Sequence, residues 1–117
     1  MVTISIEGES VILEVEAGHK LWALESRIQV AIKHIKRAAL EPNPPMGGFD
    51  GLKMMGTDLP HIFRAGTFWL HGSWAFFDVR HAEKTIVLEL ENEHFAKLFV
   101  EVEDPEAAVR MLNEHLS

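Results

Sequence analysis

Residues 2–15 read VTISIEGESVILEV, and apolar residues alternate with polar ones over much of this stretch, on both sides of Gly8. Successive side chains of a β-strand point to opposite faces, so this spacing predicts two strands that each bury one face. Glycine can adopt the positive φ that a two-residue hairpin turn requires. The stretch therefore predicts an antiparallel hairpin that turns at Gly8-Glu9, and the same alternation recurs along most of the chain.

The other alternating stretches predict a mainly β fold. Residues 35–41 fit this pattern less clearly and could instead be helical, because Ala38, Ala39 and Leu40 are good helix formers. We expect a barrel or sandwich of seven antiparallel strands, or eight if residues 19–32 break at Glu25-Ser26. Beyond the first hairpin, the strands are predicted within 19–32, 63–70, 74–80, 86–90 and 98–102.

One helix is predicted near the end of the sequence. Asp104 can cap its first turn with a carboxylate oxygen, and Pro105 suits the first helical position, where a missing N–H leaves no bond unmade. Apolar residues then recur at helical spacing, at Ala108, Val109, Leu112 and Leu116. We expect a helix over residues 105–116 whose apolar face covers one end of the β-structure.

Residues 42–62 interrupt the alternation. They hold four of the five prolines and four of the eight glycines of the chain, which disfavours regular strands. Unlike a disordered linker, they also hold large apolar residues, namely Met46, Phe49, Leu52, Met54, Met55 and Leu59. We expect a long loop that folds back on the barrel or docks on a partner.

Length and composition limit the classes of protein that fit. A chain of 117 residues predicts a single domain, 1–117. The net charge of -7 opposes binding to nucleic acid or to an anionic membrane, because both favour a basic surface. The absence of cysteine excludes disulfides, thiolate zinc sites and cysteine nucleophiles. The sequence shows neither a bilayer-spanning apolar run nor a signal-peptide pattern, so we expect a cytoplasmic protein.

Several short stretches carry a resemblance to a known family. They are His19-Lys20-Leu21-Trp22-Ala23-Leu24, Gly51-Leu52, Gly56-Thr57, Pro60, Ala65-Gly66-Thr67-Phe68, Asp78-Val79, Ile86-Val87-Leu88-Glu89-Leu90 and Val100-Glu101-Val102-Glu103-Asp104-Pro105-Glu106. In these stretches the chain resembles a group of small bacterial pleckstrin-homology (PH)-like domain proteins. The resemblance implies a bent antiparallel barrel or sandwich plugged by the C-terminal helix. It also implies a binding scaffold and no particular reaction, because a fold alone does not supply a function.

The first hairpin departs from the lipid-binding PH domains. Those domains resemble one another in placing several Lys and Arg residues in and beside this hairpin. Here the turn is Glu7-Gly8-Glu9, and its two carboxylates repel a phosphorylated headgroup. We therefore do not expect phosphoinositide membrane binding.

The sequence offers no recognisable catalytic or metal-binding motif. His71, Asp78 and His81 fall in one predicted hairpin and could approach one another. However, Asp78 and His81 are three positions apart, so they point to opposite faces of a regular strand. We expect no metal, no cofactor and no catalytic residue.

The charged clusters have ordinary interpretations beside functional ones. The basic run Lys33, His34, Lys36 and Arg37 is either an anion-binding patch or a solvated turn whose long side chains cover apolar surface. The carboxylate pairs Glu89/Glu91 and Glu101/Glu103 alternate with apolar residues. We expect both pairs on the solvent face of a sheet rather than in an acid–base site.

Apolar residues on both faces of the predicted strands give the best indication of function. Val87 and Phe99 lie among outward polar positions, so either residues 42–62 or another subunit covers this second face. We therefore expect a non-catalytic protein-interaction or assembly module that self-associates or binds a protein partner, through a sheet face or an open edge. The predicted interface residues are Phe99, Val87, Met46, Phe49, Met54, Met55 and Trp22.

Two alternative functions stay open. A small-molecule carrier would hold an apolar or planar ligand in a barrel mouth lined by Trp22, Trp69 or Trp74. An enzyme of unrecognised type would use His61 and His71, which lie in or beside the long loop.

Overall fold

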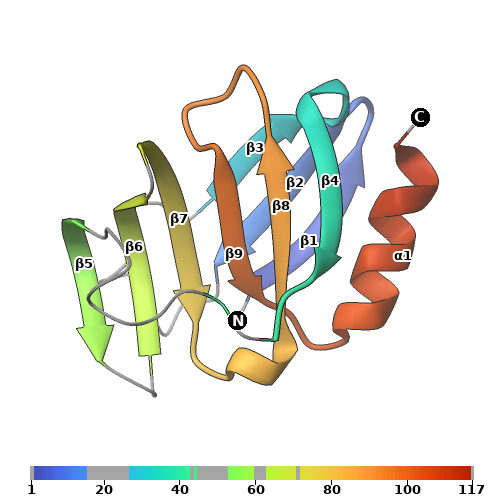
Figure 1. The fold of residues 1–117 in the computed structure, drawn as a ribbon. Coiled ribbons are helices and arrows are strands. Elements are labelled where there is room, and N and C mark those ends of the chain that lie inside the picture. The colour runs from blue at the N-terminus through green and yellow to red at the C-terminus, as the bar shows by residue number, and fades with distance from the viewer. Residues whose placement is uncertain are drawn as a thin grey trace.

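The computed structural model describes residues 2–15, 27–42, 44, 53–59, 63–70 and 72–116, with the backbone alone for 53–59, 63–66 and 70. These residues form two β-sheets and one C-terminal helix, so the fold is mainly β, as the alternation predicts. In the view of Figure 1, the smaller sheet lies behind the larger one and the helix lies at one side. In this described part of the chain, no helix is long and apolar enough to cross a membrane.

The smaller sheet is an antiparallel meander in the order β1-β2-β3. Its strands are β1 (Val2–Glu7), β2 (Ser10–Val15) and β3 (Arg27–Ala31). Gly8 has a φ of 63° in the turn between β1 and β2, a conformation that glycine adopts without strain. The predicted first hairpin is therefore confirmed.

The larger sheet has the order β4-β8-β9-β7-β6-β5 (Figure 1). Its strands are β4 (Ile35–Leu40), β5 (Lys53–Leu59), β6 (Phe63–Leu70), β7 (Ser73–Val79), β8 (Thr85–Leu90) and β9 (Lys97–Glu101). Short 3-10 turns, η2 (Ile32–His34) and η3 (Ala82–Lys84), precede β4 and β8. The described residues thus form nine strands, more than the seven or eight predicted, and β4 is a strand rather than a helix.

One pair of strands corrects the prediction of a wholly antiparallel fold. Strands β7 and β9 pair in parallel over residues 75–78 and 97–100. The chain leaves β7, runs along β8, and returns as β9 between β8 and β7. Glu101, at the end of β9, accepts hydrogen bonds from the backbone N–H groups of Arg80 at 2.8 Å and His81 at 3.0 Å. These bonds fix the turn after β7 against β9 and so stabilise the parallel arrangement.

Strand β5 corrects the prediction of an unbroken loop over residues 42–62. All seven residues of β5 pair with β6, in a register that sets Gly56 opposite Gly66. The prolines of the segment, Pro42, Pro44, Pro45 and Pro60, lie outside β5. The strand therefore keeps all its backbone N–H groups for pairing, and the high proline content of the segment does not prevent it.

Two apolar clusters lie on opposite faces of the larger sheet. The inter-sheet core joins residues of β1, β2 and β3 to alternate residues of the larger sheet, such as Phe76, Leu88 and Leu98. The outer cluster consists of Phe68, Ala75, Phe77, Val79, Val87 and Phe99. The two sheets share no strand pairing among the described residues, so they form a sandwich rather than a closed barrel.

Helix α1 (Pro105–His115) confirms the predicted C-terminal helix. Asp104 caps it, because its Oδ1 accepts a hydrogen bond from the backbone N–H of Ala107 at 3.1 Å. Leu112 is only 1% exposed and belongs to the inter-sheet core. The helix packs mainly against β4, at one side of the sandwich (Figure 1).

Candidate functional site

Three strands with described side chains lie at sheet edges: β1 and β3 in the smaller sheet and β4 in the larger one. An edge strand presents backbone N–H and C=O groups that can pair with another chain. Proteins commonly block such edges with charges, prolines, bulges or a covering element. An edge without these features is therefore a place where another chain can bind.

Strand β4 is blocked in three ways. Its register with β8 shifts between Ile35 and Arg37, which marks a bulge. Lys36 and Arg37 are exposed, and the Arg37 guanidinium donates a hydrogen bond to the Glu89 carboxylate at 2.7 Å. Helix α1 also packs against this strand. The backbone N–H and C=O groups of β4 are therefore neither regular nor uncovered enough to pair with a second chain.

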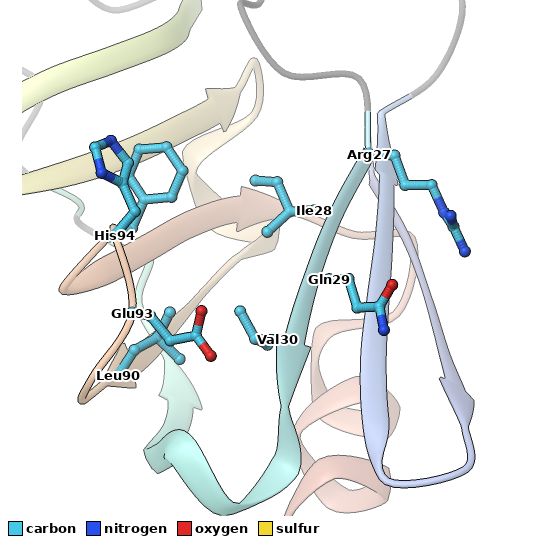
Figure 2. Close-up of a pocket in the computed structure, with 8 residues that line it drawn as sticks. Arg27, Ile28, Gln29, Val30, Leu90, Glu93 and His94 are labelled. Atoms are coloured by element: carbon cyan, nitrogen blue, oxygen red, sulfur yellow. The ribbon is translucent and has the colours of Figure 1, made fainter.

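Strand β3 faces the turn between β8 and β9 across a cleft of about 250 Å³ (Figure 2). Figure 2 shows Ile28 and Val30 pointing toward this turn. On the opposite wall, the Glu93 carboxylate already has a partner, since Nδ1 of His34 lies 2.7 Å from its Oε2. The cleft is smaller than most small-molecule pockets, which start at about 300 Å³. We therefore do not assign a ligand site to it.

In the described part of the chain, strand β1 has none of the features that block β4, and its one charged residue, Glu7, lies at its end. Residues 2–7 pair with β2 in an unbroken register and contain neither a proline nor a basic residue. The register of the edge is therefore regular, and residues 2–7 place no basic side chain along it. Among the described residues, β2 is the only strand that pairs with β1.

The backbone hydrogen bonds of β2 show which groups of β1 face outward. The Glu9 carbonyl accepts a hydrogen bond from the Ile32 N–H at 2.9 Å, on the side of β3. Because backbone groups alternate between the two sides of an antiparallel strand, the even-numbered residues of β2 point to β1 and bind its odd-numbered residues. The N–H and C=O groups of Val2, Ile4 and Ile6 therefore point away from β2, toward the open edge.

A groove of about 310 Å³ separates β1 from α1. It is lined by Val2, Thr3, Ile4, Val102, Glu103, Asp104, Ala107, Ala108 and Met111. Its floor is apolar, because Val2 and Val102 are buried while Ala108 and Met111 pack against the inter-sheet core. Residues 2–4 of β1, which include the outward-facing backbone groups of Val2 and Ile4, form one side of this β1–α1 groove.

The rim of the β1–α1 groove is acidic where the chain enters α1. Glu103 is exposed there, and none of the described residues that line the groove is a lysine or an arginine. Asp104 is also exposed, although one of its oxygens caps α1. At the other end of β1, an Arg27 guanidinium nitrogen lies 3.8 Å from a Glu7 carboxylate oxygen. A hydrogen-bonding edge, an apolar floor and a free carboxylate together suit an extended peptide segment.

A second polar cluster surrounds the end of β9. Glu101 is only 2% exposed, which corrects its predicted position on a solvent face. Besides the two backbone N–H groups that it binds, its Oε2 lies 3.0 Å from Nδ1 of His81. Burial by itself raises the pKa of Glu101, but the hydrogen bonds from His81 and Arg80 hold this pKa below its ordinary value. The carboxylate is buried because it supplies the acceptors that this turn requires, which is a structural role.

Two of the predicted interface residues, Val87 and Phe99, belong to the outer cluster. They are 2% and 3% exposed, so both are buried without a second subunit. Phe99 stacks on Phe77 with the ring centroids 4.7 Å apart. In this conformation neither side chain offers surface to a partner. The other predicted interface side chains lie outside the described part of the structure: Met46, Phe49, Met54, Met55 and Trp22.

The residues of the alternative hypotheses are placed only in part. Trp69 is 37% exposed and packs edge to face on Trp74, with ring centroids 5.1 Å apart. The two tryptophans thus contact each other. Trp22, His61 and His71 lie outside the described residues.

The metal hypothesis and the basic run are also placed in part. Asp78 is 1% exposed, whereas the side chain of His81 is 57% exposed and lies beside Glu101. Within the described ranges, no group of three or more His, Cys, Asp or Glu side chains could hold a metal ion. In the basic run, His34 and Arg37 contact glutamates, so these two side chains do not form a free anion-binding patch.

Sequence reasoning missed the β1–α1 groove. A signal for it exists, because residues 2–7 alternate without a proline or a basic residue and Glu103-Asp104 comes just before the helix. Alternation reports which face of a strand is buried, however, and not which strands end a sheet. The open edge therefore becomes visible only with the strand order.

Comparison with known proteins adds no name to this site. No family model, no curated protein and no solved structure matches the chain. The resemblance to PH-like domains therefore remains a hypothesis. The functional assignment rests on the residues of β1 and α1 themselves.

Proposed function

We propose that the chain is a non-catalytic protein-interaction module that binds an extended segment of a partner protein along β1. The observation that carries this proposal is the outer edge of β1 beside the β1–α1 groove, which no other described strand pairs with. An incoming strand would complete the hydrogen bonds of Val2, Ile4 and Ile6 and place alternate side chains over the apolar floor. The resemblance to PH-like scaffolds, which mostly bind, supports this role, and we propose the cytoplasm as its location.

The partly buried side chains of β1 favour such binding. Ile4 and Ile6 belong to the row that packs against the inter-sheet core, yet both remain only partly buried. A bound segment removes more of this apolar surface from water, which contributes about 25 cal/mol per Å² before the entropic cost of association. Because that cost is large for a short segment, we expect dissociation constants of about micromolar size.

Peptide display tests this proposal with a matched pair of variants. Random peptides of about eight residues, the length of an ordinary strand, are selected on the immobilised chain. Ala107→Trp fills the groove, and Arg110→Trp places the same side chain on an exposed position of α1 outside the groove. We expect selected peptides to bind the wild type and R110W equally, and to bind A107W at least about tenfold more weakly.

Two measurements accompany the affinities. Thermal unfolding verifies that both variants fold, and amide hydrogen exchange by NMR locates the bound peptide. We expect the N–H groups of Ile4 and Ile6 to become protected when the peptide binds. Equal binding to A107W, or protection at β3 in place of β1, would show that the β1 edge is not the site.

A further inference from the structure

We infer that the segment bound along β1 is basic, with a lysine or arginine placed beside Glu103. This inference rests on the proposed function and adds the chemistry of the partner. It starts from the described lining of the groove, in which Glu103 and Asp104 are the charged residues and no lysine or arginine occurs. A bound cation would give the exposed carboxylate of Glu103 a charge partner.

The positions along the groove restrict where this cation lies. The groove is formed by the first half of β1, residues 2–4, and by residues 102–111. Glu103 therefore shares the groove with the beginning of β1, while the only charged residue of β1, Glu7, lies at its other end near Arg27. The basic residue of the partner thus belongs opposite Val2, Thr3 or Ile4.

Strand geometry predicts the neighbours of this cation. Side chains of a bound strand alternate between two faces, so one set lies over the apolar floor at Ala108 and Met111. The other set points outward, where a charged group keeps its contact with water. The expected partner segment therefore alternates apolar and polar residues, with a lysine or arginine in the polar set.

A second copy of this chain fits the edge less well. An antiparallel β1–β1 pair sets the Glu7 end of one strand beside the Glu103 end of the other, and the Arg27 that lies there is already paired with Glu7 at 3.8 Å. The two chains also each have a net charge of -7, which opposes their association. Charge complementarity therefore favours a basic segment of a different protein.

Three synthetic peptides test the inference directly. Each has about eight residues and alternates valine with lysine, glutamine or glutamate. Fluorescence anisotropy measures their affinities for the whole chain at low salt and at about 0.5 M salt. We expect the lysine peptide to bind about tenfold more tightly than the glutamate peptide, with glutamine between them. The difference should shrink at high salt, because salt screens exposed charges.

A matched pair of charge reversals assigns the preference to one residue. Glu103→Lys changes the groove, and Glu91→Lys makes the same change of net charge at an exposed position in the turn after β8. We expect E103K to bind the lysine peptide about fivefold more weakly than the wild type does, and to bind the glutamate peptide more tightly. E91K should leave the ratio of the two affinities almost unchanged.

The possible results separate this inference from the proposed function. Equal affinities for the three peptides, with Ile4 and Ile6 protected from exchange, would overturn the basic partner and leave the β1 site standing. A dimer in sedimentation experiments that A107W abolishes would identify a second copy as the occupant and overturn the inference. Absence of binding by all three peptides and by every displayed peptide would overturn both.

Discussion

Strands β1 and β4 both lie beside α1, but the helix packs against β4 and leaves a groove of about 310 Å³ beside β1. The two strands also differ in their own residues, because β4 carries a bulge and exposed cations while β1 is regular and uncharged up to Glu7. The comparison shows that one helix can cover one sheet edge and leave a groove beside another. It also makes the position of α1 the property on which the proposed site depends.

The largest effect is expected from a change that loosens α1. Leu112→Ala removes a side chain that is 1% exposed in the inter-sheet core, which should lower the free energy of unfolding by about 2–5 kcal/mol. Urea unfolding measures the loss, and Asn113→Ala, at the next and exposed position, should change it by less than about 0.5 kcal/mol. A loss below about 1 kcal/mol for L112A would mean that α1 is not held by the core.

The second effect concerns β9, which pairs with β8, the neighbour of β4 in the larger sheet. Glu101→Gln removes the carboxylate that binds the turn after β7 and should lower the free energy of unfolding at pH 7 by about 2 kcal/mol. The control is Glu103→Gln, which removes one negative charge in the same way but at an exposed position. Urea unfolding of the two variants measures the difference, and equal losses would show that the buried carboxylate has no special role.

The pH dependence of this second effect has a definite sign. The pKa of Glu101 is lower in the folded state than in the unfolded state, so the ionised carboxylate favours folding. Its contribution to stability is therefore present above the ordinary value of 4.5 and is lost as the pH falls through the lower pKa of the folded state. The stability difference between the wild type and E101Q should shrink below about pH 4.5. A difference that grows on acidification would contradict this sign.

A smaller effect is expected at the entrance to α1. Asp104→Ala removes the hydrogen bond to the Ala107 N–H and should lower the free energy of unfolding by about 1 kcal/mol. Asp104→Asn keeps an oxygen that can cap the helix, so it should retain most of the stability. Thermal unfolding compares the two variants. An equal loss for both would assign the effect to charge rather than to capping.

The smallest effect is expected at the ion pair on β4. The side chains of Arg37 and Glu89 are 55% and 29% exposed, so solvent screens their attraction. A double-mutant cycle with Arg37→Ala and Glu89→Ala should give a coupling energy of about 0.5 kcal/mol or less. A coupling above about 1.5 kcal/mol would mean that this pair contributes more to the packing at β4 than the comparison with β1 assumes.

Local features of the fold could be predicted from the sequence. The first hairpin with its turn at Gly8 and the Asp104-Pro105 helix start depend on short-range rules, namely alternation, positive φ and capping. The strand order could not be predicted, because pairing between β7 and β9 depends on contacts between distant residues. Nor could the burial of Glu101, since alternation alone places it with the solvent-facing residues.

The candidate site shows the same division. The predicted interface began from apolar residues on a second sheet face, and Val87 and Phe99 are indeed apolar residues on that face. Whether such residues contact a partner depends on what else the chain places over them, and both are buried within the single chain. The open edge of β1 depends instead on the strand order, which places β1 at the end of the smaller sheet. The residues of β1 do not determine this order by themselves.

The insertion of β9 between β7 and β8 has a consequence for synthesis on the ribosome. Of the larger sheet, β5, β6 and β7 form one half and β4 and β8 form the other, and the two halves share no strand pairing without β9. Because translation proceeds from the N-terminus, the two halves cannot join into one sheet until residues 97–101 emerge from the ribosome. Until then, the flanks of β7 and β8 are exposed to premature contacts with other nascent chains.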